Sequence, residues 1–458
     1  METILFNLPN NLHNWRAEMK KYTNLFLFTI IGAITTACNS GAGGSNTSST
    51  SQLSSSNELN ATTTVAHPFP QSAKILYKLA DGSNAIYPTT RKDSDVETFY
   101  TYWKSTYVTT AGTLNGNTLY RIRFGKSTSQ AKQTVSEGQG YGMLITVIMA
   151  GKDLTAQNTF DGLFRYVRAN PSVNDSRLMD WHQPNHSDGD DSAFDGDADI
   201  ALALVLADQQ WGSTGAINYA QEAKNMIAGI SASTIGKNSY LPMLGDWVEQ
   251  SGKKYNQWTP RSSDFMLDNF KAYGFITGNT AYWNTVVQNS HTVIDTIQAQ
   301  YTTGLLPDFI IGSSLTTAIP AKANYLEGST DDDYSYNAGR DPWRIGTDAL
   351  LNNDAKSLAE VRKMSSWIQS ATGGNAQKIY AGYTLTGTKL SGSNYFTAFF
   401  AAPFGVAAMT GGAAQQKWLN DIYTGIKTLH EGYYEDSVNL LSLLVMTGNY
   451  WGVNTFPK

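Results

Sequence analysis

The sequence predicts an all-α fold, built as a double barrel of helices, and three observations lead to this prediction. Apolar residues recur at helical spacing in many separate segments between residues 142 and 446. Alternating apolar and polar stretches, which are typical of strands, are few and short. Segments such as IALALVLA and LLSLLV are apolar on more than one face, as expected for helices buried on both sides. Such helices, joined by long polar loops, indicate an inner ring inside an outer one rather than a bundle.

The expected helices are spread over a single large domain. No linker-like segment recurs after residue 66, so residues 67–458 are interpreted as one domain. The predicted helices cover residues 142–150, 200–211, 214–230, 264–274, 281–301, 345–351, 355–368, 395–408, 415–428 and 437–446.

The first 66 residues have the composition of an export signal and a tether. An apolar run follows Lys20 and Lys21 and ends at Cys38, so residues 1–38 resemble a lipoprotein signal that starts at Met19 and is lipidated at Cys38. The alternative is a transmembrane anchor, for which the run is short. Residues 39–66 are rich in Ser, Thr, Asn and Gly and predict a flexible tether. We therefore expect a secreted protein or one anchored to the outer membrane through its lipidated N-terminus.

The amino-acid composition limits the classes of molecule that the chain is expected to bind. The formal net charge of −5 excludes a basic surface of the kind that binds nucleic acid. The chain has 11 Trp and 25 Tyr, which suits stacking on sugar rings, although most of these side chains are expected to pack in the core. The single cysteine excludes an intrachain disulfide. We expect a monomer that does not bind nucleic acid.

The first motif that could take part in catalysis is SEGQGYGM at residues 136–143. It predicts a helix start with Ser136 as the N-cap and Glu137 in the first turn, and the alternative is that Glu137 only interacts with the helix dipole. A helix N-terminus lowers the pKa of a carboxyl group. A general acid at this position therefore needs burial and a second carboxylate to raise its pKa.

The second motif is AFDGDADIALALVLADQQW at residues 193–211. Its three aspartates at alternate positions, Asp195, Asp197 and Asp199, do not meet the Gly and Glu requirements of an EF-hand loop, so no calcium site is predicted. We expect one aspartate to be an N-cap and another to be exposed to solvent. The remaining aspartate is a candidate carboxylate in a cleft.

The third motif, DDDYSYNAGRDPWRI, covers residues 331–345 and places Pro342 in the first turn of a helix. Its two arginines and three aromatic residues form a surface suited to orienting sugar hydroxyls. The alternative is a structural loop held by ion pairs.

SEGQGYGM, AFDGDADIALALVLADQQW and YNAGRDPWRIGTD, in this order, resemble the signatures of glycoside hydrolase family 8, and the resemblance covers essentially all of residues 67–458. It implies an (α/α)6 barrel with a long acidic cleft, and inverting hydrolysis of a polysaccharide without a metal or other cofactor. By position, Glu137 matches the general acid and Asp195 the aspartate that contacts the sugar at subsite −1. Phe194 departs from the Ser or Thr that is usual before this aspartate.

Asn337 is the informative departure from the family pattern. In the cellulase and xylanase branch this position is an Asp that acts as the base. The resemblance to a second branch, of lichenase and chitosanase type, implies Asn here and a base in a preceding inserted loop. Glu327 fits that place, ten residues earlier, with Asp332 as the fallback. An inverting pair of carboxyl groups lies about 6.5–9.5 Å apart.

The segment TPRSSDFM at residues 259–266 also resembles the second branch. The sequence thus predicts an inverting endo-hydrolase of β-1,4 linkages in a β-glucan-type polysaccharide: mixed-linkage glucan (lichenan), chitosan or cellulose. The alternatives are a non-catalytic, surface-anchored glycan-binding lipoprotein and a cellulose-biosynthesis endoglucanase, and Asn337 argues against the latter. The expected substrate contacts are Tyr141, Trp181, Trp247, Arg261, Asp264, Tyr336, Asn337, Arg340 and Arg344.

Overall fold

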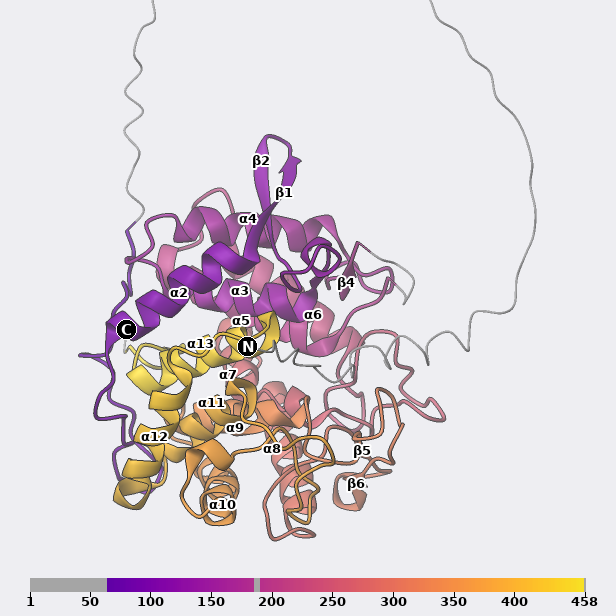
Figure 1. Ribbon diagram of the computed structural model, residues 1–458. Helices are drawn as coiled ribbons and strands as arrows, with labels where there is room; N and C mark the ends of the chain where they lie inside the picture. Colours follow the sequence, from indigo (N-terminus) through magenta and orange to yellow (C-terminus); the bar gives the residue numbers. More distant parts are fainter. Residues whose placement is uncertain (1–63, 185–189, 457–458) are drawn as a thin grey trace, which may run out of the picture. The chain divides into compact units, whose positions relative to one another are not determined.

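Two concentric rings of helices make up the computed structural model of the protein, which describes residues 64–184 and 190–456 (Figure 1). The predicted export signal, Cys38 and almost all of the predicted tether lie outside these residues. Residues 65–458 form one compact unit. No helix in the described part of the chain is both long enough and apolar enough to cross a bilayer.

Six of the described helices form the inner ring, in which each helix packs against the next and the last packs against the first. Nearly all of their side chains are buried, which explains why these segments are apolar on more than one face. The inner helices are α3 (Ser136–Ile148), α5 (Phe194–Trp211), α7 (Leu267–Thr277), α9 (Asp341–Leu351), α11 (Ala398–Ala408) and α13 (Tyr433–Thr447).

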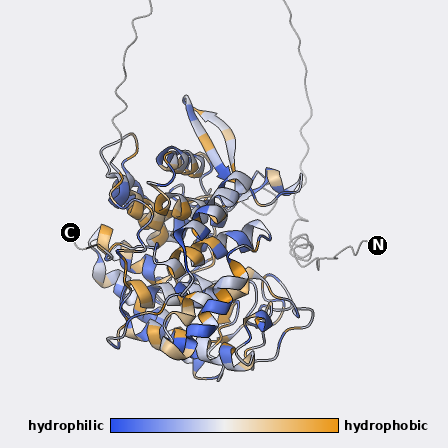
Figure 2. Ribbon diagram, turned by 60° about the vertical axis from the view of Figure 1, so that its left-hand side comes forward, coloured by the Kyte–Doolittle hydropathy of each residue, from blue (hydrophilic) through white to orange (hydrophobic). Residues whose placement is uncertain are grey.

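The outer helices alternate with the inner ones along the chain, and each packs against an inner neighbour. Each buries one face and leaves the other to solvent. The hydropathy colouring of Figure 2 shows apolar segments along the helices of the domain. The outer helices are α2 (Asp93–Tyr107), α4 (Ala156–Ala169), α6 (Tyr219–Ser233), α8 (Thr280–Gln298), α10 (Ala355–Ala371) and α12 (Gln416–Ile426).

The predicted all-α double barrel is therefore confirmed. Pro342 lies in the first turn of α9, as expected. Two helices, α2 and α4, were absent from the prediction. The buried face of α2 is largely aromatic, with Phe99, Tyr100, Trp103 and Tyr107, and aromatic residues are weaker helix formers than the aliphatic residues that mark the inner ring.

Strands are short and lie at the margins of the barrel. β1 (Val108–Leu114) and β2 (Asn117–Ile122) form an antiparallel hairpin that projects from the barrel beside α4 (Figure 1). Two further antiparallel pairs are β3 (Thr134–Val135) with β4 (His182–Gln183), and β5 (Ile310–Ile311) with β6 (Ile319–Pro320). The β3–β4 pair fixes the chain immediately before α3.

Two glycines allow the first turns of α3 and α5 to approach closely. A Cβ on Gly140 would lie 2.7 Å from Asp199 Cβ, and one on Gly196 would lie 2.6 Å from the backbone nitrogen of Glu137. Since Cβ atoms do not approach backbone atoms so closely, any side chain at residue 196 must push the two helices apart.

Replacing Gly196 by Ala is therefore expected to lower the free energy of unfolding by about 1–3 kcal/mol, the usual cost of overpacking. The first turn of α3 would also move, so activity should fall with stability. Urea denaturation measures the first effect. Gly215→Ala is the matched control, because a Cβ there meets no atom within 4 Å. Equal stability of the two variants would contradict this packing argument.

Candidate active site

The N-terminal ends of the inner helices bring four side chains into contact at one end of the barrel. Glu137 lies in the first turn of α3 and Asp195 in the first turn of α5. Arg340 directly precedes α9, and Tyr433 begins α13. Segments about 300 residues apart in the chain thus contribute to a single cluster.

Arg340 is the centre of this cluster. Its Nη1 atom donates to Glu137 Oε2 at 2.9 Å and to Asp195 Oδ2 at 2.7 Å. Its Nη2 atom donates to Ser263 Oγ at 2.8 Å and to Asn337 Oδ1 at 3.2 Å. The side chain is only 1% exposed. A buried guanidinium group with this many partners fixes the positions of both carboxyl groups.

Glu137 has the electrostatics of a general acid. Burial raises its pKa to about 7, the charge of Asp195 acts in the same direction, and Arg340 opposes the rise. Tyr433 donates a hydrogen bond to Glu137 Oε1 at 2.6 Å. The Glu137 side chain remains 17% exposed, so a substrate can reach it. Burial thus outweighs the effect of the helix N-terminus, as a proton donor near neutral pH requires.

Replacing Tyr433 by Phe is expected to move the alkaline limb of kcat/KM to higher pH. The hydroxyl group stabilises the ionised form of Glu137, so its loss raises the pKa of Glu137 further. A pH profile of kcat/KM measures this shift, because kcat/KM reports the free enzyme. Tyr434→Phe is the control, since the Tyr434 hydroxyl donates to the Tyr336 carbonyl instead. An unmoved limb in Tyr433→Phe would show that the bond does not tune the acid.

The pKa of Asp195 is shifted in the opposite direction to that of Glu137. Burial opposes its ionisation, but Arg340 and Arg261 outweigh burial and hold its pKa at about 2. Its Oδ1 atom accepts the backbone N–H of Gly196 at 2.9 Å. The pKa values of the neighbouring carboxyl groups of Glu137 and Asp195 are therefore shifted in opposite directions, which is the usual signature of an acid beside a carboxylate.

Two expectations about the helix starts are wrong. Val135, not Ser136, is the N-cap of α3, because β3 holds residue 135 extended until the helix begins. No aspartate of the second motif is an N-cap or exposed: Asp195, Asp197 and Asp199 are all buried. The α5 N-terminus lies inside the barrel mouth, where Met179 N–H donates to Asp197 at 2.9 Å.

Glu327 lies across the cluster from Glu137, in the loop between β6 and α9. Its Oε2 atom accepts a hydrogen bond from Asn337 Nδ2 at 2.8 Å, and its Oε1 atom accepts one from Arg261 Nη2 at 3.2 Å. The side chain is 30% exposed. Asn337 therefore links Glu327 to Arg340, and the two side chains bridge the space between the carboxyl groups of Glu137 and Glu327.

Two buried aspartates hold the segments that carry Glu327 and Asn337. Asp331 accepts the backbone N–H groups of residues 326–328 at 2.7–2.9 Å. Asp308 accepts those of residues 335, 337 and 338 at 2.7–3.1 Å. Asp332 is half-buried, and in the described residues its side chain has no hydrogen bond to Arg340, Asn337 or Arg261. The geometry therefore favours Glu327 over Asp332 as the partner of Glu137.

The sequence-predicted substrate contacts fall into two groups. Five of them are buried, namely Tyr141, Asp264, Asn337, Arg340 and Arg344. Tyr141 packs edge-on against Trp343, and Arg344 pairs with Asp199 through two bonds of 2.8 and 2.6 Å. Direct contact of these five with a substrate stays a prediction, as it does for the equally buried Asp195. The others, Trp181, Trp247, Arg261 and Tyr336, are partly exposed.

Sequence reasoning missed Tyr433, Ser263, Asp308 and Asp331. The motif YYEDSVNLL begins α13 but has no feature that links it to Glu137, 296 residues earlier. Asp331 was seen only as part of a run of three aspartates. Its burial under three backbone N–H groups depends on the fold of the loop.

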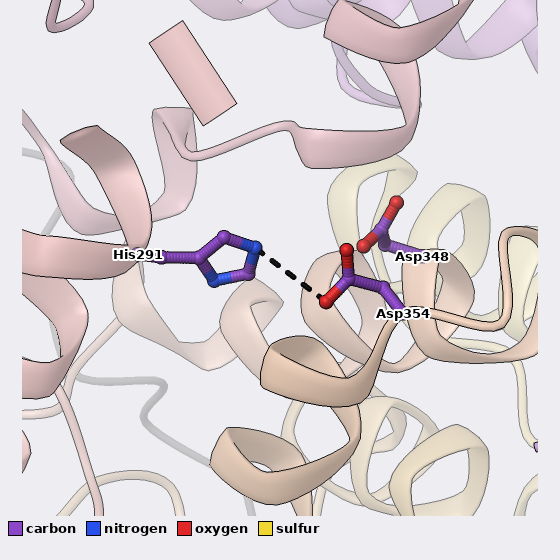
Figure 3. Close-up of side chains that lie close together, drawn as sticks. All are labelled: His291, Asp348 and Asp354. Carbon is purple, nitrogen blue, oxygen red and sulfur yellow. Dashed lines mark ion pairs between the residues drawn. The ribbon is translucent and has the colours of Figure 1, made fainter. Parts of the chain in front are cut away.

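A second group of titratable side chains comes from α7, α8, the last turns of α9 and the start of α10. His291, Asp348 and Asp354 lie close together in Figure 3. Lys271 Nζ lies between the two carboxylates, 2.7 Å from Asp348 and 2.9 Å from Asp354. A hydrogen bond of 2.8 Å joins Glu360 Oε1 and His291 Nδ1. The ammonium group of Lys271 thus already occupies the place that a metal ion would take between these side chains. The cluster is therefore structural.

Comparison with known proteins places this geometry in a family. Residues 84–448 match the sequence profile "Glycosyl hydrolases family 8". The chain belongs to glycoside hydrolase family 8. It is therefore a glycoside hydrolase, as the three motifs indicated.

Relatives over most of the chain support this assignment. A β-glucanase of Niallia circulans is 43% identical over 84% of this chain and 91% of its own. An endoglucanase of Bacillus sp. strain KSM-330 is 36% identical over 87% of this chain and 85% of its own. The apo structure of a β-1,3-1,4-glucanase from Paenibacillus sp. X4 has 42% identity and a TM-score of 0.77 over 84% of this chain and 99% of its own.

Proposed function

We propose that this enzyme is an inverting endo-β-glucanase that cleaves β-1,4 linkages in mixed-linkage β-1,3-1,4-glucan. The observation that carries the proposal is the pairing of Glu137, whose pKa is raised to about 7 by burial, with Glu327, which is 30% exposed and linked to Glu137 through Asn337 and Arg340. The similarity to glucanases at 42–43% identity supports the choice of substrate.

In this mechanism Glu137 donates its proton to the glycosidic oxygen as the bond to the anomeric carbon breaks. Glu327 takes a proton from a water molecule, and the hydroxide oxygen forms the new bond on the opposite face of the ring. Asp195, ionised and fixed by Arg340, accepts hydrogen bonds from the hydroxyl groups of the sugar at subsite −1. The product has an inverted anomeric configuration.

We propose inversion rather than retention for the pair Glu137 and Glu327. A retaining pair needs a nucleophile about 5–5.5 Å from the acid, whereas an inverting pair needs space for a water molecule. Among the described residues, Glu137 and Glu327 have no hydrogen-bond partner in common, and they are linked through the bonded side chains of Arg340 and Asn337. This arrangement supports a water-mediated displacement.

The test is the release of reducing ends from barley-type mixed-linkage glucan, lichenan, carboxymethyl-cellulose and chitosan under identical conditions. We expect the highest kcat/KM on the two mixed-linkage substrates, with internal cleavage shown by a rapid fall in viscosity. A preference for chitosan would change the proposed substrate but not the proposed reaction. Binding to all four without hydrolysis would favour the rival interpretation as a glycan-binding lipoprotein.

We also propose that the enzyme acts outside the cytoplasm, tethered at Cys38. The support is the order of basic, apolar and small residues that ends at Cys38, followed by the Ser- and Thr-rich segment. Mass spectrometry of the processed protein tests this. A mature N-terminus at Cys38 carrying acyl chains is the expected result, and an unprocessed chain would contradict it.

A further inference from the structure

Asp264 is a fully buried carboxyl group without a hydrogen bond. It lies at the end of the short turn Ser262–Asp264, its side chain is 0% exposed, and neither of its oxygen atoms has a hydrogen-bond partner. The nearest cation is Arg261, whose Nη1 atom is 3.9 Å from Asp264 Oδ1. A buried carboxylate with no partner is costly, so either the group is neutral or its surroundings must rearrange when it ionises.

The charges around Asp264 are unbalanced if every group is ionised. Arg261 also donates to Glu327 at 3.2 Å and lies 3.5 Å from Asp195, and Arg340 contacts Glu137 and Asp195. Arg261 and Arg340 are therefore the nearest cations of four carboxyl groups, of which two are buried and two are partly exposed. With all four ionised, these carboxyl groups carry two more charges than the two guanidinium groups offset. The four are Glu137, Asp195, Asp264 and Glu327.

The groups facing Asp264 come from every element packed against its turn. These elements are α5, α9 and the turn Ala338–Arg340, in addition to its own segment. Burial raises the pKa of Asp264 to about 7, Arg261 opposes the rise and Asp195 adds to it. Asp341 is buried, accepts a bond from Ser262, and has its pKa held well above the usual range by burial. The charged or titratable groups facing Asp264 are Asp195, Arg261, Arg340, Asp341 and Arg344.

We propose that Asp264 is a positioning residue that must be protonated for the site to work. In its neutral form it leaves Arg261 bound to Glu327 and Asp195. On losing its proton it draws Arg261 toward itself, and Glu327 loses one of the two hydrogen bonds that orient it, the one from Arg261. Asp264 therefore acts on the base through Arg261, without touching the substrate. This inference rests on the proposed roles of Glu137 and Glu327.

The first test is the slope of the alkaline limb in a plot of log(kcat/KM) against pH. If Glu137 and Asp264 must both hold protons, the wild-type limb approaches a slope of −2. Asp264→Asn keeps a neutral side chain of the same shape at all pH values, so its limb should have a slope of −1. A wild-type slope of −1 would overturn the proposal without any variant, as would a slope of −2 in Asp264→Asn.

The second test needs no substrate. Infrared difference spectra between about pH 5 and pH 9 detect the carbonyl stretch of carboxylic acids that lose their protons in this range. The wild-type protein should lose one band that Asp264→Asn lacks, and a different band that Glu137→Gln lacks. If the Asp264 band disappears in this pH range but the protein hydrolyses no glycan, Asp264 is protonated at the lower pH as inferred, and the proposed function is refuted. Absence of that band would refute the proposal for Asp264 whatever the activity.

Discussion

Replacing Glu137 by Gln is expected to lower kcat on mixed-linkage glucan by roughly 100- to 10,000-fold, the usual contribution of general acid catalysis. The amide keeps the shape of the side chain: its oxygen can accept from Arg340 and its NH2 group can donate to the Tyr433 hydroxyl, so the fold should remain intact. It has no proton to transfer to the leaving oxygen. Initial rates and the melting temperature measure the two expectations.

The role of Glu137 as an acid predicts a dependence on the leaving group. An aryl oligosaccharide whose phenolate leaves without a proton should be hydrolysed by Glu137→Gln at a rate close to that of the wild-type enzyme. If the variant loses activity equally on the glucan and on the aryl oligosaccharide, Glu137 serves in binding or positioning, and another residue is the acid.

Replacing Glu327 by Gln is expected to lower kcat by a similar factor on both kinds of substrate, because the attacking water still needs a base. The amide can keep its contact with Arg261 through its oxygen, so binding should change less than turnover. Glu327→Ala opens space at the site. Added azide, which needs no base, should then restore product formation as a glycosyl azide.

Asp332→Asn is the matched control for the base. It lies five residues after Glu327 in the same loop and has no hydrogen bond to the described residues of the cluster around Arg340. It should retain wild-type turnover. Normal turnover in Glu327→Gln together with loss in Asp332→Asn would transfer the base to Asp332.

Much of the fold was predictable because burial leaves a direct mark on sequence. The inner helices are apolar on several faces, as in IALALVLA of α5 and LLSLLV of α13, and no surface helix has that pattern. Outer helices with aromatic faces, such as α2, carry a weaker signal. Helix starts were less accurate, because the Asp195, Asp197 and Asp199 side chains are buried by the barrel mouth and not by their own helix.

The site was predictable only where its residues fall within compact motifs. Glu137, Asp195 and Arg340 lie in three such motifs, and the structure brings them within hydrogen-bonding distance. Tyr433 could not be found, since its contact with Glu137 depends on the closure of the ring between α13 and α3. Nor could the buried position of Asp264, which depends on tertiary packing rather than on neighbouring residues.

The most direct test of the account is the anomeric configuration of the first product. Proton NMR during rapid hydrolysis of a mixed-linkage oligosaccharide resolves the α and β anomeric signals before mutarotation equilibrates them. Displacement by a water molecule activated by Glu327 predicts that the α-anomer appears first and the β-anomer follows slowly. Initial release of the β-anomer would contradict the pairing of Glu137 with Glu327 as acid and base.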